Sequence, residues 1–188
     1  MKSYMTASIN PEHTINQVKQ IVESNKRSEI RLNANGGNSI LLVCAPEQEH
    51  AFITKLQEML NNEDYELIDL NELLISFIEN SGDIKELFEL LKGSVHQIFK
   101  SPEEEIGNDL FSLILSAIEN SYLNDKIPVL IHNGALYGSG IDNIHLMESE
   151  LVMKSNKPLI IVYPATQNGD KLMFLNSRPA SKYRCMIV

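Results

Sequence analysis

The chain has 188 residues, 43% of them hydrophobic and 22% charged, which is the composition of an ordinary globular domain. No apolar stretch approaches the ~20 residues of a membrane span, and the first residues lack the apolar run of a signal peptide. We therefore expect a single domain, residues 1–188, in the cytoplasm and without a membrane segment. Cys44 and Cys185 are too few for a disulfide scaffold and lie in apolar runs, so both are expected to be reduced and buried.

The net charge of −9 is unevenly distributed along the chain. Residues 46–125 contain 18 acidic residues against four lysines, a formal charge of −14, whereas the two flanks together carry +5. An acidic surface repels the phosphates of nucleic acids, so we do not expect direct nucleic-acid binding by this part of the chain. Solvated helix faces account for such a charge without any function.

The first forty residues predict a helix and a turn. Pro11–Ile30 is expected to be one helix, because its apolar residues form a single stripe: Ile15, Val18, Ile21 and Val22. Asn33–Asn38 is composed of Asn, Ala and Gly, which is typical of a turn. Residues 1–38 therefore precede the first strand.

A strand, a helix and a second strand follow. Ser39–Ala45 is a continuous apolar run, which predicts a strand buried on both faces. Pro46 suits the first turn of a helix, where Glu47 and Glu49 would lie at the positive end of the helix dipole. Tyr65–Leu70 predicts the second strand, which completes a βαβ unit.

Residues 71–124 are predicted to be almost entirely helical, because apolar residues recur at helical spacing throughout. This stretch is about twice as long as the connection between two parallel strands requires. Its helices either only cover one face of the sheet or also protrude and bind a partner protein. Glu103, Glu104 and Glu105 are the candidate residues for such a contact.

The remainder predicts a strand, a helix and another strand: Ile127–His132, about Asp142–Lys154, and Pro158–Tyr163. We expect a tight turn at Tyr163–Pro164. The chain should then end in a hairpin formed by Lys171–Leu175 and Tyr183–Val188, with the last strand, Arg184–Val188, buried.

These elements predict an α/β fold of three layers, in which a mainly parallel sheet is flanked by helices and followed by a C-terminal hairpin. The topology is P-loop-like or Rossmann-like, and ligands in such folds bind beyond the carboxyl ends of the strands. The loop after the first strand nevertheless lacks the Walker motif, because it has no glycine, no Lys-Ser/Thr pair and two carboxylates, Glu47 and Glu49. We therefore expect no nucleotide or other cofactor.

A glycine-rich loop follows the strand Ile127–His132. Gly134, Gly138, Ser139 and Gly140 lie between this strand and the next helix, where backbone amides could hold an anion or another ligand. The spacing matches neither nucleotide-binding fingerprint, and the loop contains no lysine. A purely structural turn is the alternative.

Other motifs give weaker indications. Four basic residues cluster in the tail, which suggests a nucleic-acid-binding arm but without interleaved aromatic residues: Lys171, Arg178, Lys182 and Arg184. The histidines lack the spacing of metal ligands, so no metal site is expected. Ser139 has no catalytic-triad motif around it, and Asp69 is expected to cap the helix that begins near Asn71.

Several of these features together resemble the BrxB family, components of the BREX bacteriophage-exclusion systems that are often described only as a domain of unknown function. The resemblance runs from about Asn38 to Val188 and includes Pro46-Glu47 after the first strand and the Gly134-x-x-Tyr137 loop. Its most specific part is the order of residues in the tail: Tyr163, Pro164, Gly169, Leu172, Phe174, Tyr183 and Arg184. Ala165 departs from the family pattern, which has glycine there, and Gly138–Gly140 stands in place of an arginine.

The resemblance implies a small subunit of a multi-component antiviral defence system, in a family without an established enzymatic activity. The implied partners are other BREX proteins, notably the PglZ-type phosphatase-superfamily subunit and the large ATPase. The prediction is therefore a non-catalytic interaction or scaffold subunit. Two alternatives remain: a nucleotide- or anion-binding enzyme that uses the Gly134–Gly140 loop, and a nucleic-acid-binding accessory protein that uses the basic tail.

Overall fold

The computed structural model describes residues 10–24, 27–82, 86, 89, 92–94, 96–101, 109–168, 171–180 and 184–188. Glu103, Glu104 and Glu105, proposed from the sequence as partner-binding residues, lie outside these ranges, as do Gly169 and Tyr183 of the tail motif. None of the described helices is long and apolar enough to cross a membrane.

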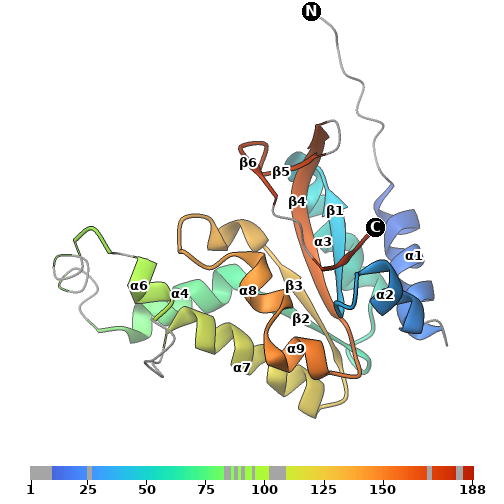
Figure 1. Ribbon diagram of the computed structural model, residues 1–188, viewed down its shortest axis with the longest axis horizontal. Coiled ribbons are helices and arrows are strands. Elements are labelled where there is room, and N and C mark those ends of the chain that lie inside the picture. Colours follow the sequence, from blue (N-terminus) through green and yellow to red (C-terminus); the bar gives the residue numbers. More distant parts are fainter. Residues whose placement is uncertain are drawn as a thin grey trace, which may run out of the picture.

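The centre of the molecule is a mainly parallel β-sheet (Figure 1). Five parallel strands follow the order β2-β3-β4-β1-β7: Tyr65–Asp69, Ile127–Ile131, Leu159–Asn168, Ser39–Cys44 and Met186–Ile187. Two further strands, β5 (Lys171–Phe174) and β6 (Arg178–Pro179), extend β4 as an antiparallel meander. The predicted α/β fold with a parallel sheet is confirmed.

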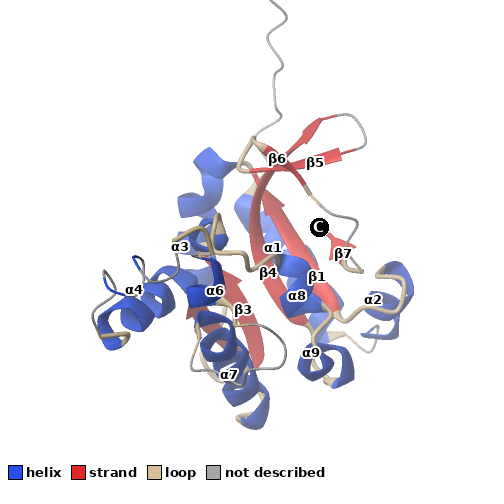
Figure 2. Cartoon of the chain, turned by 60° about the vertical axis from the view of Figure 1, so that its left-hand side comes forward, coloured by secondary structure: helices blue, strands red, loops and turns tan. Residues whose placement is uncertain are grey.

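Helices cover both faces of this sheet, as Figure 2 shows. One face carries α1, α2 and α3: Pro11–Glu23, Arg27–Asn33 and Glu49–Met59. The opposite face carries α4, α7, α8 and α9: Leu70–Asn80, Leu110–Leu123, Asn143–Met147 and Glu150–Lys154. Helix α6 (His96–Phe99) and the 3₁₀ helices η1 (Pro46–Gln48) and η2 (Asn133–Leu136) complete the described elements.

Alternation of side chains along the strands divides the core into two layers. In β1, Ile40 and Leu42 pack toward α1 and α3, whereas Leu41 packs toward α7 and α8. All three are fully buried, because successive residues of a strand point to opposite faces and both faces are covered. The continuous apolar run of the sequence is explained by this burial.

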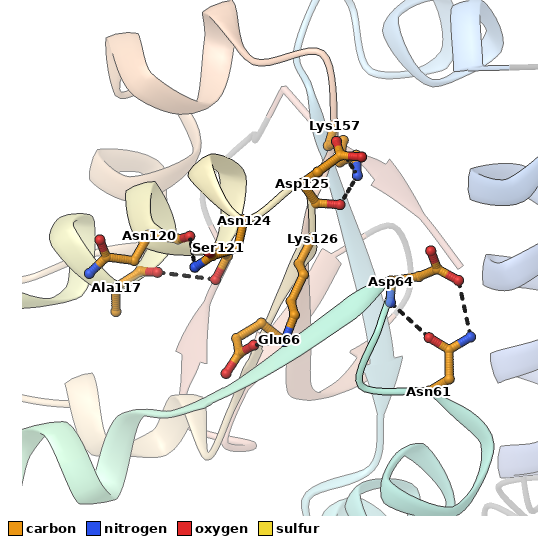
Figure 3. Close-up of polar contacts among 10 residues, drawn as sticks. All are labelled: Asn61, Asp64, Glu66, Ala117, Asn120, Ser121, Asn124, Asp125, Lys126 and Lys157. Carbon is orange, nitrogen blue, oxygen red and sulfur yellow. Dashed lines mark hydrogen bonds and ion pairs between the residues drawn. The ribbon is translucent and has the colours of Figure 1, made fainter.

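The amino edge of the sheet is held by polar contacts among the strand ends and the loops that precede them (Figure 3). Lys126 forms an ion pair with Glu66 at 2.7 Å, and Lys157 forms one with Asp125 at 2.6 Å. Each pair is partly exposed, so it contributes about 0–1 kcal/mol and mainly fixes the ends of the strands. The glycine-rich loop, Tyr163 and Pro164 lie on the opposite side, at the carboxyl edge.

Two helices that the sequence predicted as continuous are interrupted. The predicted helix Pro11–Ile30 ends at Glu23, because Ser24 adopts an extended backbone, and α2 begins only at Arg27. The predicted helix Asp142–Lys154 is divided into α8 and α9, because Ser149 has an extended ψ and its hydroxyl caps α9 by accepting from the Val152 N–H. The apolar stripes continue across both breaks, so periodicity alone does not reveal them.

The predicted turn at Tyr163–Pro164 is wrong. Strand β4 continues through both residues to Asn168, and Pro164 lies opposite Cys44 in the last pair between β4 and β1. The Pro164 carbonyl accepts from the Leu175 N–H at 2.9 Å, so β5 begins to pair with β4 beside it. Proline is tolerated here because it lies at the end of the parallel pairing, where the sheet loses little hydrogen bonding through the missing N–H.

The predicted C-terminal hairpin is also wrong. Strand β5 pairs with β4 and β6, whereas the last strand, β7, runs parallel to β1, with Met186 opposite Ile40. Within this last segment Cys185 is buried, but Arg184 and Ile187 are exposed, so the expected burial of the whole segment is only partly correct. Both cysteines are free and buried, as predicted.

Candidate functional site at the carboxyl edge of the sheet

The carboxyl ends of β1, β2, β3 and β4 meet at one edge of the sheet. The connection after β1 leaves over the face of α3, and the connection after β3 leaves over the opposite face, toward α8. Ligands of open α/β sheets bind in the crevice that such diverging connections create. This edge is therefore the expected position of a binding site.

The loop after β1 presents carboxylates where a phosphate-binding loop would present amides. It forms the short helix η1, in which Glu47 is exposed, and Glu49 then begins α3. Burial raises the pKa of the Glu49 carboxyl group; the charge of Asp69 raises it further, and His132 opposes the increase. Burial, with the charges of Glu49 and Glu47, also raises the pKa of the Cys44 thiol to about 12, so Cys44 remains a protonated thiol.

The acidic loop leads to a prediction about nucleotides. A titration of the protein with Mg-ATP or Mg-GTP in a calorimeter should give no binding in the micromolar range, because Glu47 and Glu49 repel the phosphates and no lysine is present in the loop. Micromolar or tighter binding would contradict the prediction. The variant Glu47→Lys provides a comparison, since it reverses one charge without adding a Walker motif.

Asp69 caps α4, as the sequence predicted. Its Oδ1 accepts from the N–H of Asn71 at 2.9 Å and from the N–H of Glu72 at 3.4 Å. The same oxygen lies 2.9 Å from Nδ1 of His132, although that ring nitrogen is not aligned for a hydrogen bond. His132 adopts a left-handed backbone conformation (φ 56°), which places the start of η2 against the cap of α4.

The glycine-rich loop is closed by its own contacts. The Ser139 hydroxyl donates to the Leu136 carbonyl at 2.8 Å and accepts from the Ile141 N–H at 3.1 Å. Gly138 and Gly140 have positive φ angles, and a Cβ at Gly140 would lie 2.8 Å from the Cβ of His96. These contacts account for the glycines and for Ser139 structurally. Anion binding by Gly134 and the rest of the loop stays a prediction.

The tail residues of the family resemblance have different environments. Tyr163 is buried and its ring stacks on that of Phe174, with 4.9 Å between the ring centroids. Pro164, the next residue of β4, is also buried and lies opposite Cys44, the last residue of β1. Arg184 is exposed, with Nε 3.9 Å from an oxygen of Glu148. Tyr163 and Pro164 therefore have a packing role at the carboxyl edge.

The basic residues of the tail are separated by the fold. Arg178 lies on β6 with its guanidinium 5.8 Å from the centre of the Tyr137 ring, whereas Arg184 lies beside Glu148 before β7.

Within the described ranges, no group of three or more His, Cys, Asp and Glu side chains is arranged to hold a metal ion. The ring of His145 packs edge-on against Phe111, and its Nδ1 accepts from the Asp142 N–H.

The sequence did not predict a groove of about 710 Å³ at the carboxyl end of β1. It is bordered by four segments that are distant in the sequence: the first turns of α1, helix η1, the β4–β5 hairpin and strand β7. Apolar and polar side chains both line it, which is typical of small-molecule sites of this size. Its walls meet only when β7 pairs with β1, so a scan of local patterns could not identify it.

Comparison with known proteins gives no assignment for this arrangement. No family model matches the chain, no curated protein matches it, and no solved structure matches it.

Proposed function

We propose that this chain is a non-catalytic interaction subunit of a BREX-type phage-defence complex, and that α4 carries the contact surface for a partner protein. The resemblance of the tail to the BrxB family supports the type of complex. The observation that carries the choice of surface is the exposure of Ile75 and Ile78, which are 55% and 37% exposed on the same helix.

The position of α4 suits an interaction surface. Figure 1 shows α4 and α6 extending away from the sheet. Only Leu70 at the start of α4 is buried, whereas Leu73, Leu74 and Phe77 are half-buried against the core. Aliphatic side chains spaced three apart, such as Ile75 and Ile78, lie on one side of a helix and can fit a shallow apolar site on a partner.

The side chains around Ile75 and Ile78 indicate the chemistry of the partner surface. Glu72 and Glu79 are exposed on the same helix, three or four residues from Ile75. A partner with an apolar centre and a basic rim would match this surface in shape and charge. By the family resemblance, the candidates are the PglZ-type subunit and the large ATPase. The acidic loop after β1 argues against the alternative of a nucleotide-binding enzyme.

The test is co-purification of the tagged protein with co-expressed BREX partners. The double variant Ile75→Asp/Ile78→Asp should recover at least about tenfold less partner, because two charges would be placed at the centre of the contact. Both side chains are already exposed, so the variant should remain folded.

Matched controls are available on other helices. Leu32 and Leu123 are each 77% exposed, on α2 and at the end of α7. Leu32→Asp and Leu123→Asp should recover the partner at the wild-type yield. Equal losses for controls and the double variant would mean that exposed apolar residues bind non-specifically, and an unchanged yield for the double variant would exclude α4 as the contact.

A further inference from the structure

The groove at the carboxyl end of β1 combines apolar walls with a single charged side chain, Glu47. Its apolar lining comes from strand ends and the hairpin, with Val43, Leu172 and Ile187 as the larger side chains. Ile187 is 58% exposed although it is an isoleucine of the sheet, so a ligand could remove it from water. The polar lining includes Gln17, Gln48 and Thr166, whose neutral side chains can bind either donors or acceptors.

The charge of the lining is negative. Glu47 has the one side chain among the described lining residues that is charged at neutral pH when histidine is counted as neutral. No lysine or arginine contributes to the described lining, and the next carboxylate along the chain, Glu49, also lies at the carboxyl end of β1. The two glutamates act together on Cys44, the last residue of β1, since both charges add to the effect of burial on the pKa of its thiol.

Helix dipoles oppose this charge but do not cancel it. The amino ends of α1 and α3 both border the groove, and each contributes about half a positive charge. The first amides of α1 are already bound, because Oδ1 of Asn10 accepts from the N–H groups of Glu12 and His13. Each half-charge is smaller than the charge of Glu47, and the Asn10 cap already uses the first amides of α1, so the site remains negative. An anionic ligand is therefore disfavoured at the place where this class of fold usually binds phosphates.

We propose that this groove binds a small organic cation with an apolar body, such as an alkylamine, with its ammonium group beside Glu47 and its hydrocarbon part against Ile187 and Leu172. The volume of about 710 Å³ is in the range of small-molecule sites, and the groove lies at the carboxyl edge of the sheet, where ligands of such folds bind. The proposal is independent of the interaction surface on α4, because no residue of α4 is among the described lining residues of the groove.

Three probes with the same hydrocarbon chain and different head groups test the proposal: hexylammonium, hexanol and hexanoate. Each is titrated into the ¹⁵N-labelled protein while the amide shifts of Val43, Ala45 and Ile187 are followed by NMR. Hexylammonium should bind about three- to fivefold more tightly than hexanol at low salt, and hexanoate more weakly than either. The amide shifts should move together, because these residues line one groove or belong to the strand that borders it.

Two variants assign the two parts of the site. Glu47→Gln keeps the shape of the side chain and should reduce the preference for hexylammonium over hexanol, whereas Glu79→Gln on α4 should leave all affinities unchanged. Ile187→Ser should weaken the binding of all three probes while the melting temperature stays near that of the wild type, since the side chain is largely exposed.

Three results would overturn the proposal. Binding of hexanoate as tight as that of hexylammonium would show that the groove does not select a positive charge. Shifts confined to residues outside the groove would place the ligand elsewhere. No shift with any probe at concentrations of about 20 mM would show that the groove holds only water.

Discussion

Deletion of residues 185–188 is expected to lower the free energy of unfolding by about 3–6 kcal/mol. The segment contributes Cys185, which is buried, and Met186 and Val188, which are partly buried against the core. It also supplies two backbone hydrogen bonds to β1, from the Val43 N–H to the Val188 carbonyl and from the Val188 N–H to the Leu41 carbonyl, each 2.9 Å. Since small domains are stable by only ~5–15 kcal/mol, the variant should be partly or wholly unfolded.

Urea denaturation followed by circular dichroism measures this loss. Ile187→Ser is the control, because it changes the most exposed side chain of β7 and leaves the strand in place; its free energy of unfolding should fall by less than about 1 kcal/mol. A deletion variant with the same midpoint as the full-length protein would show that β7 does not stabilise β1.

Gly37→Ala is expected to destabilise the protein by about 3 kcal/mol, a large effect for one methyl group. A Cβ at Gly37 would lie 1.9 Å from the carbonyl oxygen of Arg184, which is a backbone atom and cannot rotate away. The turn before β1 and the segment before β7 would have to separate. The pairing of β7 with β1, and with it one wall of the groove, should be lost or weakened.

The neighbouring glycine distinguishes this clash from backbone strain. Gly36 has a φ of 87°, but a Cβ at this position would have no atom within 4 Å, so Gly36→Ala should cost about 1 kcal/mol through strain alone. Thermal unfolding of both variants gives the comparison. Equal melting temperatures would mean that the Arg184 carbonyl moves aside easily and that the close approach at Gly37 has little effect.

The sequence predicted those elements whose signals are local. The run Ser39–Ala45 is apolar without interruption, and Asp69 precedes a helical stripe, so strand β1 and the cap of α4 could both be predicted. The buried cysteines followed from the same apolar runs. Each of these features depends on neighbours within a few residues along the chain.

The errors concern strand pairing and interruptions. A proline after Tyr163 suggested a turn, but pairing of β4 with β1 on one side and with β5 on the other keeps the backbone extended through Pro164. The strand Met186–Ile187 carries no signal for its partner, and its pairing with β1 depends on the close approach at Gly37. Such long-range contacts are chosen by the whole fold and not by local propensity.

The candidate sites were predictable only in part. The carboxylates that replace a phosphate-binding loop could be recognised in the sequence, because their position after the first strand is defined by the fold class. The groove beside them could not, since its lining comes from both ends of the chain. The exposed pair Ile75 and Ile78 continues the apolar pattern of a core helix, so only the structure shows that these side chains face solvent.

Hydrogen–deuterium exchange on the assembled complex tests the proposed interaction surface most directly. The protein is compared alone and with its co-purified BREX partner, and the exchange of α4 is compared with that of α2, which lies on the opposite face of the sheet. The proposal predicts slower exchange in α4, residues 70–80, when the partner is bound, and no change in α2. Unchanged exchange in α4 together with protection elsewhere would contradict it.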